Sequence, residues 1–164
     1  PEIEINEELI PLVVKSALLK RILSKTSFSM ASQDVRYYLN GMLLEIQGDK
    51  LNGVATDGHR LAFSSAKSGN SELDVRNILP RKAVLELAKL LSPGENEVNL
   101  LIGPSYVEVK TDNLSFSSKL IDGKYPDYDK VFPTGNPLPL EIDKETLQAA
   151  LSRASVYLMK NIEA

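Results

Sequence analysis

The sequence predicts an α+β fold in which two helices cover one face of an antiparallel β-sheet. Three observations support this prediction: two amphipathic helical segments, short strand-like segments around them, and turn-forming dipeptides between the strands. The 164 residues fit one domain and part of another, because single domains cluster around 100–150 residues. The chain has no cysteine, which excludes disulfides and thiolate chemistry and suits a reducing cytoplasm.

Two segments have the apolar periodicity of amphipathic helices. Ser16–Thr26 repeats leucine and isoleucine at three- and four-residue spacing, and its basic side chains fall on the opposite side. Arg81–Leu91 repeats this design, and Pro80 precedes it at a position that needs no helical backbone donor. We expect these two helices to lie side by side on the sheet.

The other regular segments alternate in the way that strands do, and Gly- and Asp-containing dipeptides such as Asp57-Gly58 separate them. Asp122–Pro137 contains three prolines and predicts an ordered irregular segment that becomes a linker. The predicted strands are Tyr38–Gln47, Leu51–Thr56, Arg60–Ser65, Asp74–Ile78, Glu97–Ile102, Tyr106–Thr111 and Leu114–Leu120.

An internal repeat indicates the start of a second domain. Ile10–Val14 (IPLVV) is echoed by Leu138–Ile142 (LPLEI), and the helical leucines that follow match at the same offset. The prolines of the two segments, Pro11 and Pro139, lie 128 residues apart, which is an ordinary domain length. Unless the match is due to chance, the chain holds one domain and the first strand and helix of another. Because it begins with Pro1 rather than Met, we expect a piece of a longer protein.

The charge distribution is uneven. The net charge of −3 argues against a uniformly basic nucleic-acid binder, yet residues 15–26 hold four basic side chains and no acid. Residues 80–92 hold three basic side chains and one acid. These segments are either two solvated helix faces or a one-sided electrostatic footprint for a polyanion.

Catalytic chemistry is poorly represented. His59 is the only histidine, and with Asp57 it forms the one candidate for a general base with an orienting carboxylate. Asp57-Gly58 is also a strong tight-turn signal, so Asp57 is better explained as a turn residue that bonds its own backbone. One histidine and no cysteine give too few zinc ligands, and the glycines lack phosphate-loop spacing. We expect no enzyme, no metal and no cofactor.

Tyr37 and Tyr38 follow the first basic helix. In an extended chain they point to opposite faces, so one is expected in the core. The other either stacks on a nucleotide base or covers a sheet edge. The longest apolar segment, Leu9–Val14, is far shorter than the ~20 residues of a membrane span, and no signal segment opens the chain.

Several strings resemble one family, the bacterial β sliding clamps of DNA polymerase III, throughout their middle domain. The longest are Met30–Leu43 (MASQDVRYYLNGML) and Val54–Ala62 (VATDGHRLA). Shorter ones are Leu79–Lys82, Ser118–Gly123 and Tyr125–Tyr128. The resemblance implies a linker from a missing first domain at residues 1–7, the middle domain at 8–136 and a truncated third domain at 137–164.

The family's ring implies two sites. Each domain places two helices on a channel around duplex DNA, and phosphate contacts there carry no sequence information. Carried over residue by residue, the channel side chains are Lys20, Arg21, Lys25, Gln33, Tyr37, Tyr38, Arg81, Lys82 and Lys89. The family's hydrophobic pocket for short peptide motifs falls on Leu39, Thr56, Gly58, His59, Arg60, Leu61, Pro126, Lys130 and Val131.

Three pocket positions leave questions open. Lys130 stands where the family often has Arg, so a bidentate contact there would lose its planar fork. Leu39 and Leu61 are also explained by simple core packing. The implied partners are duplex DNA, the polymerase III catalytic subunit, the clamp loader and repair polymerases, in a cytoplasmic homodimeric ring without membrane contact. A small hydrolase using His59 and a stand-alone protein-interaction domain are the alternatives.

Overall fold

A computed structural model describes residues 9–69, 73–94, 96–135 and 138–160 of the chain. The chain divides into two compact units, Pro1–Asp127 and Tyr128–Ala164. The predicted linker at residues 1–7 lies outside the described residues. Among the described residues, no helix is both long and apolar enough to cross a membrane.

The first unit follows one order of elements twice. Each half runs strand, helix, and then three strands, with short 3₁₀ turns η1 (Ser27–Ser29) and η2 (Tyr37–Leu39) in the first half. The first half contains β1 (Ile10–Lys15), α1 (Ser16–Thr26), β2 (Gly41–Gln47), β3 (Lys50–Thr56) and β4 (Leu61–Lys67). The second half contains β5 (Asp74–Pro80), α2 (Arg81–Leu90), β6 (Glu97–Ile102), β7 (Tyr106–Thr111) and β8 (Leu114–Lys119).

The strands form two four-stranded antiparallel sheets, in the orders β1-β6-β7-β8 and β4-β3-β2-β5. The opening strand of each half joins the sheet of the other half: β1 pairs with β6, and β5 pairs with β2. This exchange ties the two halves together through backbone hydrogen bonds. The predicted α+β class with antiparallel sheet is confirmed, and the sheet is divided into two.

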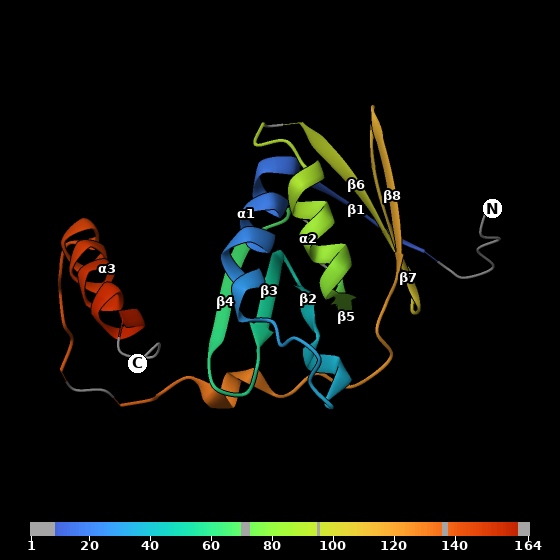
Figure 1. Cartoon of the computed structure of the whole chain (residues 1–164). Coiled ribbons are helices and arrows are strands. Elements are labelled where there is room, and N and C mark those ends of the chain that lie inside the picture. Colours follow the sequence, from blue (N-terminus) through green and yellow to red (C-terminus); the bar gives the residue numbers. More distant parts are fainter. Residues whose placement is uncertain (1–8, 70–72, 95, 136–137, 161–164) are drawn as a thin grey trace. The chain divides into compact units, whose positions relative to one another are not determined.

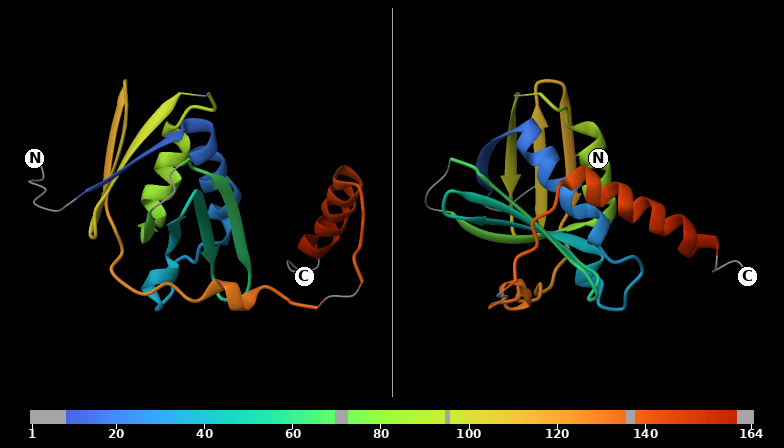
Figure 2. Two further views of the ribbon diagram at one scale, coloured as in Figure 1. Left: turned by 180° about the vertical axis from the view of Figure 1, so that it is seen from behind. Right: turned by 90° about the vertical axis from the view of Figure 1, so that its left-hand side faces the viewer.

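The two helices lie side by side, as predicted (Figure 1). α1 contacts β3 and β4, whereas α2 contacts β2 and β5 of the same sheet. Leu19, Ile22 and Leu87 are almost fully buried in a core that both sheets share. Burial of each such side chain contributes about 1.5–3 kcal/mol to folding. The views in Figure 2 show both sheets around the helix pair.

Gly53 explains how closely α1 approaches β3. A Cβ added at Gly53 would lie 2.4 Å from Cγ2 of Ile22, so no larger residue fits without movement of the helix. Helix α1 is therefore held at a fixed distance from the sheet, and its basic face points away from the core.

Two sequence-based predictions around Tyr37 were wrong. The strand predicted from Tyr38 begins instead at Gly41, because η2 occupies Tyr37–Leu39. Neither tyrosine is in the core: Tyr37 is 57% exposed and Tyr38 is half-buried, while Leu39 is buried. The 3₁₀ turn replaces the two-residue alternation of a strand and directs Leu39 inward. The two tyrosine rings contact each other edge to face at 5.7 Å.

In the second unit, the predicted helix is present and the predicted strand is not. The unit contains the 3₁₀ turn η3 (Tyr128–Val131) and the helix α3 (Lys144–Lys160). Asp143 caps α3, because its Oδ1 accepts hydrogen bonds from Thr146 N and Oγ1, both at 2.8 Å. The repeat predicted a strand at 138–142, but these residues form none. A single strand without a pairing partner leaves its backbone groups unsatisfied.

Candidate functional site

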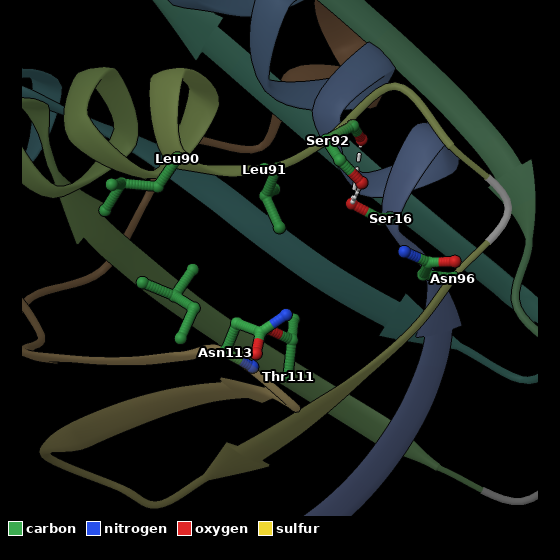
Figure 3. A pocket seen from close by; sticks show the side chains of 8 residues that line it. Ser16, Leu90, Leu91, Ser92, Asn96, Thr111 and Asn113 are labelled. Carbon is green, nitrogen blue, oxygen red and sulfur yellow. Dashed lines mark hydrogen bonds between the residues drawn. The ribbon is translucent and has the colours of Figure 1, made fainter.

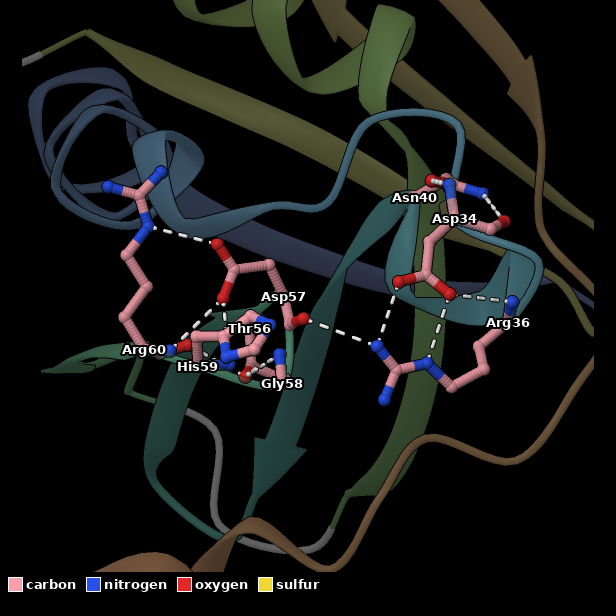
Figure 4. Close-up of polar contacts among 8 residues, drawn as sticks. All are labelled: Asp34, Arg36, Asn40, Thr56, Asp57, Gly58, His59 and Arg60. Carbon is pink, nitrogen blue, oxygen red and sulfur yellow. Dashed lines mark hydrogen bonds and ion pairs between the residues drawn. The ribbon is translucent and has the colours of Figure 1, made fainter. Parts of the chain in front are cut away.

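The turn between β3 and β4 is built by its own side chains (Figure 4). Asp57 Oδ1 accepts hydrogen bonds from His59 N and Arg60 N, both at 3.0 Å, as expected from the Asp-Gly signal. Thr56 closes the base of the turn, because its hydroxyl donates to the Arg60 carbonyl at 2.7 Å and accepts from Gly58 N at 3.1 Å. The turn therefore presents Gly58, His59 and Arg60 to solvent in one fixed arrangement.

The Asp57 carboxylate is committed to this turn. Besides the two backbone bonds, its Oδ2 accepts from Nε of Arg60 at 3.1 Å. The backbone N–H of His59 is the main cause that lowers the pKa of Asp57. The carboxylate is thus bonded to the backbone of His59 and to Arg60, which leaves the catalytic alternative without geometric support. Among the described residues, no group of three or more His, Asp and Glu side chains could hold a metal.

A second polar segment, the loop of residues 28–36, lies beside this turn. Gln33 adopts a left-handed backbone conformation (φ 59°), the only non-glycine residue to do so in the described part of the chain. Asn40 fixes the loop by donating to the Asp34 carbonyl and accepting from Asp34 N, at 2.8 and 2.9 Å. Arg81 at the start of α2 donates to the Met30 carbonyl at 3.2 Å. The strained conformation is held by these surrounding bonds.

Two arginines join the loop to the turn in opposite directions. Arg36, from the loop, donates to the Asp57 carbonyl at 3.3 Å. Arg60, from the turn, donates to the Phe28 carbonyl at 2.8 Å and stacks over the Phe28 ring at 5.7 Å. Between loop and turn is a polar cleft of about 510 Å³ whose lining includes Gln33, Asp34, Arg36, His59, Arg60 and Arg81.

Arg36 was not among the residues predicted from the sequence. Its guanidinium forms a two-point ion pair with Asp34, with Nη2–Oδ2 at 2.8 Å and Nε–Oδ1 at 3.0 Å. This hydrogen bonding is the main cause that lowers the pKa of Asp34 to about 2, so the carboxylate is ionised at neutral pH. The Asp-x-Arg spacing in the loop, close to the Asp-x-x-Arg spacing in the turn, was the available signal.

The predicted channel cations differ in whether they form hydrogen bonds or ion pairs within the domain. Lys20 donates to the Leu91 carbonyl at 2.7 Å, so it links α1 to the end of α2. Arg21 reaches the Ser65 carbonyl at 3.4 Å, and Lys89 pairs with Glu86 at 3.2 Å. Lys25 and Lys82 are exposed and form no hydrogen bond or ion pair with other described residues. They are therefore the helix cations best able to bind an external anion.

The predicted pocket residues are distributed over both units. In the first unit, Leu39 is 2% exposed, Leu61 is half-buried at the start of β4, and Pro126 is exposed. Lys130 and Val131 belong to the second unit, where both are exposed. Leu39 is a core residue in this structure, as its simple-packing interpretation expects, so only its edge could form the floor of a pocket.

Tyr125 anchors the segment before Pro126 to the turn. It is buried, and its hydroxyl accepts a hydrogen bond from Thr56 N at 3.1 Å. Burial raises the pKa of Tyr125 to about 12, so the phenol stays protonated. This contact ties Pro126 to the same turn that carries His59 and Arg60.

A further cavity of about 320 Å³ lies where α2 ends and α1 begins (Figure 3). Its polar groups bond one another: Ser16 Oγ donates to the Ser92 carbonyl at 2.8 Å, and Ser16 N donates to the Asn96 carbonyl at 2.8 Å. These bonds connect the start of α1 to the segment that follows α2, and they satisfy a backbone donor at the start of the helix.

Replacement of Gly58 with Ala should disturb both the turn and Arg36. Gly58 has φ +89°, which costs a residue with a Cβ about 1–2 kcal/mol. The added Cβ would also lie 3.0 Å from Nη1 and Nη2 of Arg36 and displace the guanidinium. We expect the melting temperature to fall by about 2–8 °C and amide exchange in the loop of residues 28–36 to accelerate.

Gly48→Ala is the matched control for this substitution. Gly48 also has a left-handed backbone (φ +58°), but a Cβ added there meets no atom within 4 Å. It should lower the melting temperature without changing exchange in the loop. Equal loop exchange in the two variants would show that Arg36 does not transmit the change.

Known proteins resemble the part of the chain that contains the loop and the turn. Residues 13–127 match the family model for the central domain of the DNA polymerase III beta subunit. The chain is 42% identical over 157 residues to the beta sliding clamp of Pseudomonas aeruginosa and 46% identical over 156 residues to that of Vibrio cholerae. Each alignment covers 95% of this chain, and the chain spans 43% of the length of each relative.

Solved structures agree with the sequence matches. A crystal structure of the Pseudomonas aeruginosa beta subunit superposes with a TM-score of 0.88 at 42% identity, covering 95% of this chain and 43% of that one. A second structure of that clamp, bound to griselimycin, gives a TM-score of 0.87 at 42% identity, covering 95% and 42% of the two chains. The relatives are named for a sliding clamp rather than for a reaction. The chain therefore belongs to the beta-subunit family of DNA polymerase III, the sliding clamps, and its residues 13–127 match the central domain of that family.

Proposed function

We propose that the intact protein is a non-catalytic processivity factor that encircles duplex DNA as a homodimeric ring. The observation that carries this proposal is the placement of exposed cations on two adjacent helices of a chain whose net charge is −3. Such cations attract phosphates without reading bases, which suits a ring that slides. Gln33, Tyr37 and Tyr38, on or next to the neighbouring polar loop, would add contacts close to the channel.

We further propose that the protein tethers enzymes through short hydrophobic peptide motifs. The exposed turn residues Gly58, His59 and Arg60 would border the site, and the apolar edges of Leu61 and Pro126 would contact the motif. Leu39, Thr56, Lys130 and Val131 complete the proposed set. The partners would be the polymerase III catalytic subunit, the clamp loader and repair polymerases in the cytoplasm, where the DNA is.

The domain boundaries form part of the same proposal. Residues 1–7 would be a linker from a preceding domain, residues 8–136 the central domain, and residues 137–164 the start of a third domain. The apolar side chains that α3 leaves exposed support this division, among them Leu147 and Leu151. In the intact protein, the remainder of the third domain would bury them.

Binding of the intact protein to a short linear duplex tests the channel. We expect affinity to fall steeply with salt between 50 and 200 mM, as it does for proteins that contact several phosphates. Lys25→Ala and Lys82→Ala each remove one cation that would face a phosphate. Each variant should weaken binding equally on all sequences and reduce the salt slope by about one. Fluorescence anisotropy at several salt concentrations measures both quantities.

Lys110→Ala serves as the control for these variants. Lys110 is an exposed lysine on β7 rather than on either helix, and it pairs with Glu108 at 2.9 Å. Its removal should leave the salt slope unchanged. If Lys110→Ala reduces the slope as much as Lys82→Ala, the helix cations do not form the DNA-binding surface.

A further inference from the structure

The side chain of Asn40 closes the loop of residues 34–40, which we call the tyrosine loop because it contains Tyr37 and Tyr38. The amide contacts the backbone of Asp34 at two points: Nδ2 donates to the Asp34 carbonyl at 2.8 Å, and Oδ1 accepts from Asp34 N at 2.9 Å. Figure 4 shows Asn40 beside Asp34 in this arrangement. The side chain thus supplies both backbone partners that an adjacent strand would otherwise provide.

The backbone of Asn40 joins the tyrosine loop to α2. Its carbonyl accepts a hydrogen bond from Arg81 N at 3.0 Å, and its N–H donates to the Tyr37 carbonyl at 3.1 Å. Arg81 is the first residue of α2, where backbone donors lack partners within the helix. Four hydrogen bonds therefore meet at Asn40, and they fix the loop that bears Tyr37 to the helix that bears Lys82.

The Tyr37 ring is supported on two sides while its hydroxyl stays available. The residue is 57% exposed, and its ring contacts Tyr38 edge to face at 5.7 Å. A Cβ added at Gly123 would lie 3.3 Å from Cε2 and 3.4 Å from the hydroxyl oxygen of Tyr37, so the ring rests against this glycine. The hydroxyl forms no hydrogen bond with the rest of the described chain. The direction of this donor is therefore set by the loop that Asn40 closes.

We propose that Asn40 is a positioning residue for DNA binding, which holds the Tyr37 hydroxyl where it donates a hydrogen bond to a phosphate of the duplex. The inference rests on the proposed function, in which duplex DNA passes α1 and α2. Tyrosine hydroxyls are among the groups that bind phosphates without reading bases. Asn40 itself does not touch DNA. Because the loop is fixed before the phosphate arrives, little conformational entropy is lost on binding.

The residue type at position 40 follows from the same contact. Only an amide side chain of this length offers a donor and an acceptor in one plane to the two backbone groups of Asp34. Alanine offers neither group, so Asn40→Ala should release the loop without adding a charge that would itself repel phosphates. Tyr37→Phe keeps the ring and its contact with Tyr38 but removes the hydroxyl.

A double-mutant cycle in the intact protein tests the role of Asn40. Fluorescence anisotropy at low salt gives the affinity for a labelled linear duplex of the unmodified protein, Tyr37→Phe, Asn40→Ala and the double variant. Each single variant should bind about fivefold more weakly, the usual net effect of one hydrogen bond. The double variant should also lose about fivefold, because both changes remove the same contact. Independent effects would multiply to about 25-fold.

Asn77→Ala is the matched control for Asn40→Ala. It also removes a half-buried amide that donates to a backbone carbonyl, that of Gly103 at 3.3 Å, and should leave duplex affinity unchanged. If Asn40→Ala fails to fold, Asn40→Ser decides the question, because its side chain is too short to reach both backbone groups of Asp34.

Two results would overturn the positioning role and leave the ring proposal intact. One is normal duplex binding by Tyr37→Phe, and the other is a loss in the double variant equal to the product of the single losses. An unmodified protein that does not bind duplex at low salt would overturn the proposed function as well.

Discussion

Replacement of Leu61 with Asp should weaken peptide binding to the intact protein by at least about a hundredfold. Leu61 is half-buried at the start of β4, directly after the exposed turn residues His59 and Arg60. An incoming apolar side chain would bury the new carboxylate without a partner, because Arg60 is already bonded to Asp57 and Phe28. Burial of an unpaired charge costs several kcal/mol, and each 1.4 kcal/mol is a tenfold change in affinity. Isothermal titration calorimetry with a peptide motif from the polymerase III catalytic subunit measures the change in affinity.

Two companion variants separate a disrupted pocket from a disrupted fold. Leu114→Asp makes the same change at a half-buried leucine on β8, outside the proposed pocket, and should leave peptide affinity unchanged. Leu61→Met conserves volume and should bind within a few-fold of the unmodified protein. A Leu61→Asp protein that melts normally and binds normally would mean that the pocket lies elsewhere.

The strands were predictable from sequence where they end at clear turns. Glu97–Ile102 and Tyr106–Thr111 were predicted with the observed bounds, because Gly103-Pro104 separates two alternating segments. The division into two sheets could not be predicted in the same way. β1 pairs with β6 across more than eighty residues, and alternation shows which face of a strand is buried without showing its neighbour.

In the candidate site, too, local contacts were predictable from the sequence and long-range contacts were not. The Asp57 turn was predicted correctly because its hydrogen bonds reach only two or three residues along the chain. Tyr37 was misjudged because a 3₁₀ turn interrupts the alternation that the prediction assumed. Two long-range hydrogen bonds, from Arg36 to the Asp57 carbonyl and from Arg60 to the Phe28 carbonyl, join the loop to the turn. Nothing in the local sequence specifies those partners. Such long-range polar contacts can be identified only once the fold is known.

Retention on circular DNA should give the largest difference of all between the intact protein and this 164-residue chain. Salt screens the attraction between helix cations and phosphates, since the Debye length shrinks to about 3 Å at 1 M. Salt does not open a closed ring. We expect the intact protein, after incubation with its clamp loader, to stay on a circular duplex at high salt.

Linearisation of the circle provides the decisive contrast. A ring that is held by topology should slide off the new ends, whereas a protein that is held by charge should be indifferent to them. The 164-residue chain spans less than half the length of its relatives and should dissociate from circle and linear duplex alike at high salt. Gel filtration of the labelled proteins with their DNA, before and after cutting, records each outcome. If the intact protein leaves the uncut circle at high salt, then the cations of α1 and α2 hold DNA by charge alone and the ring proposal is wrong.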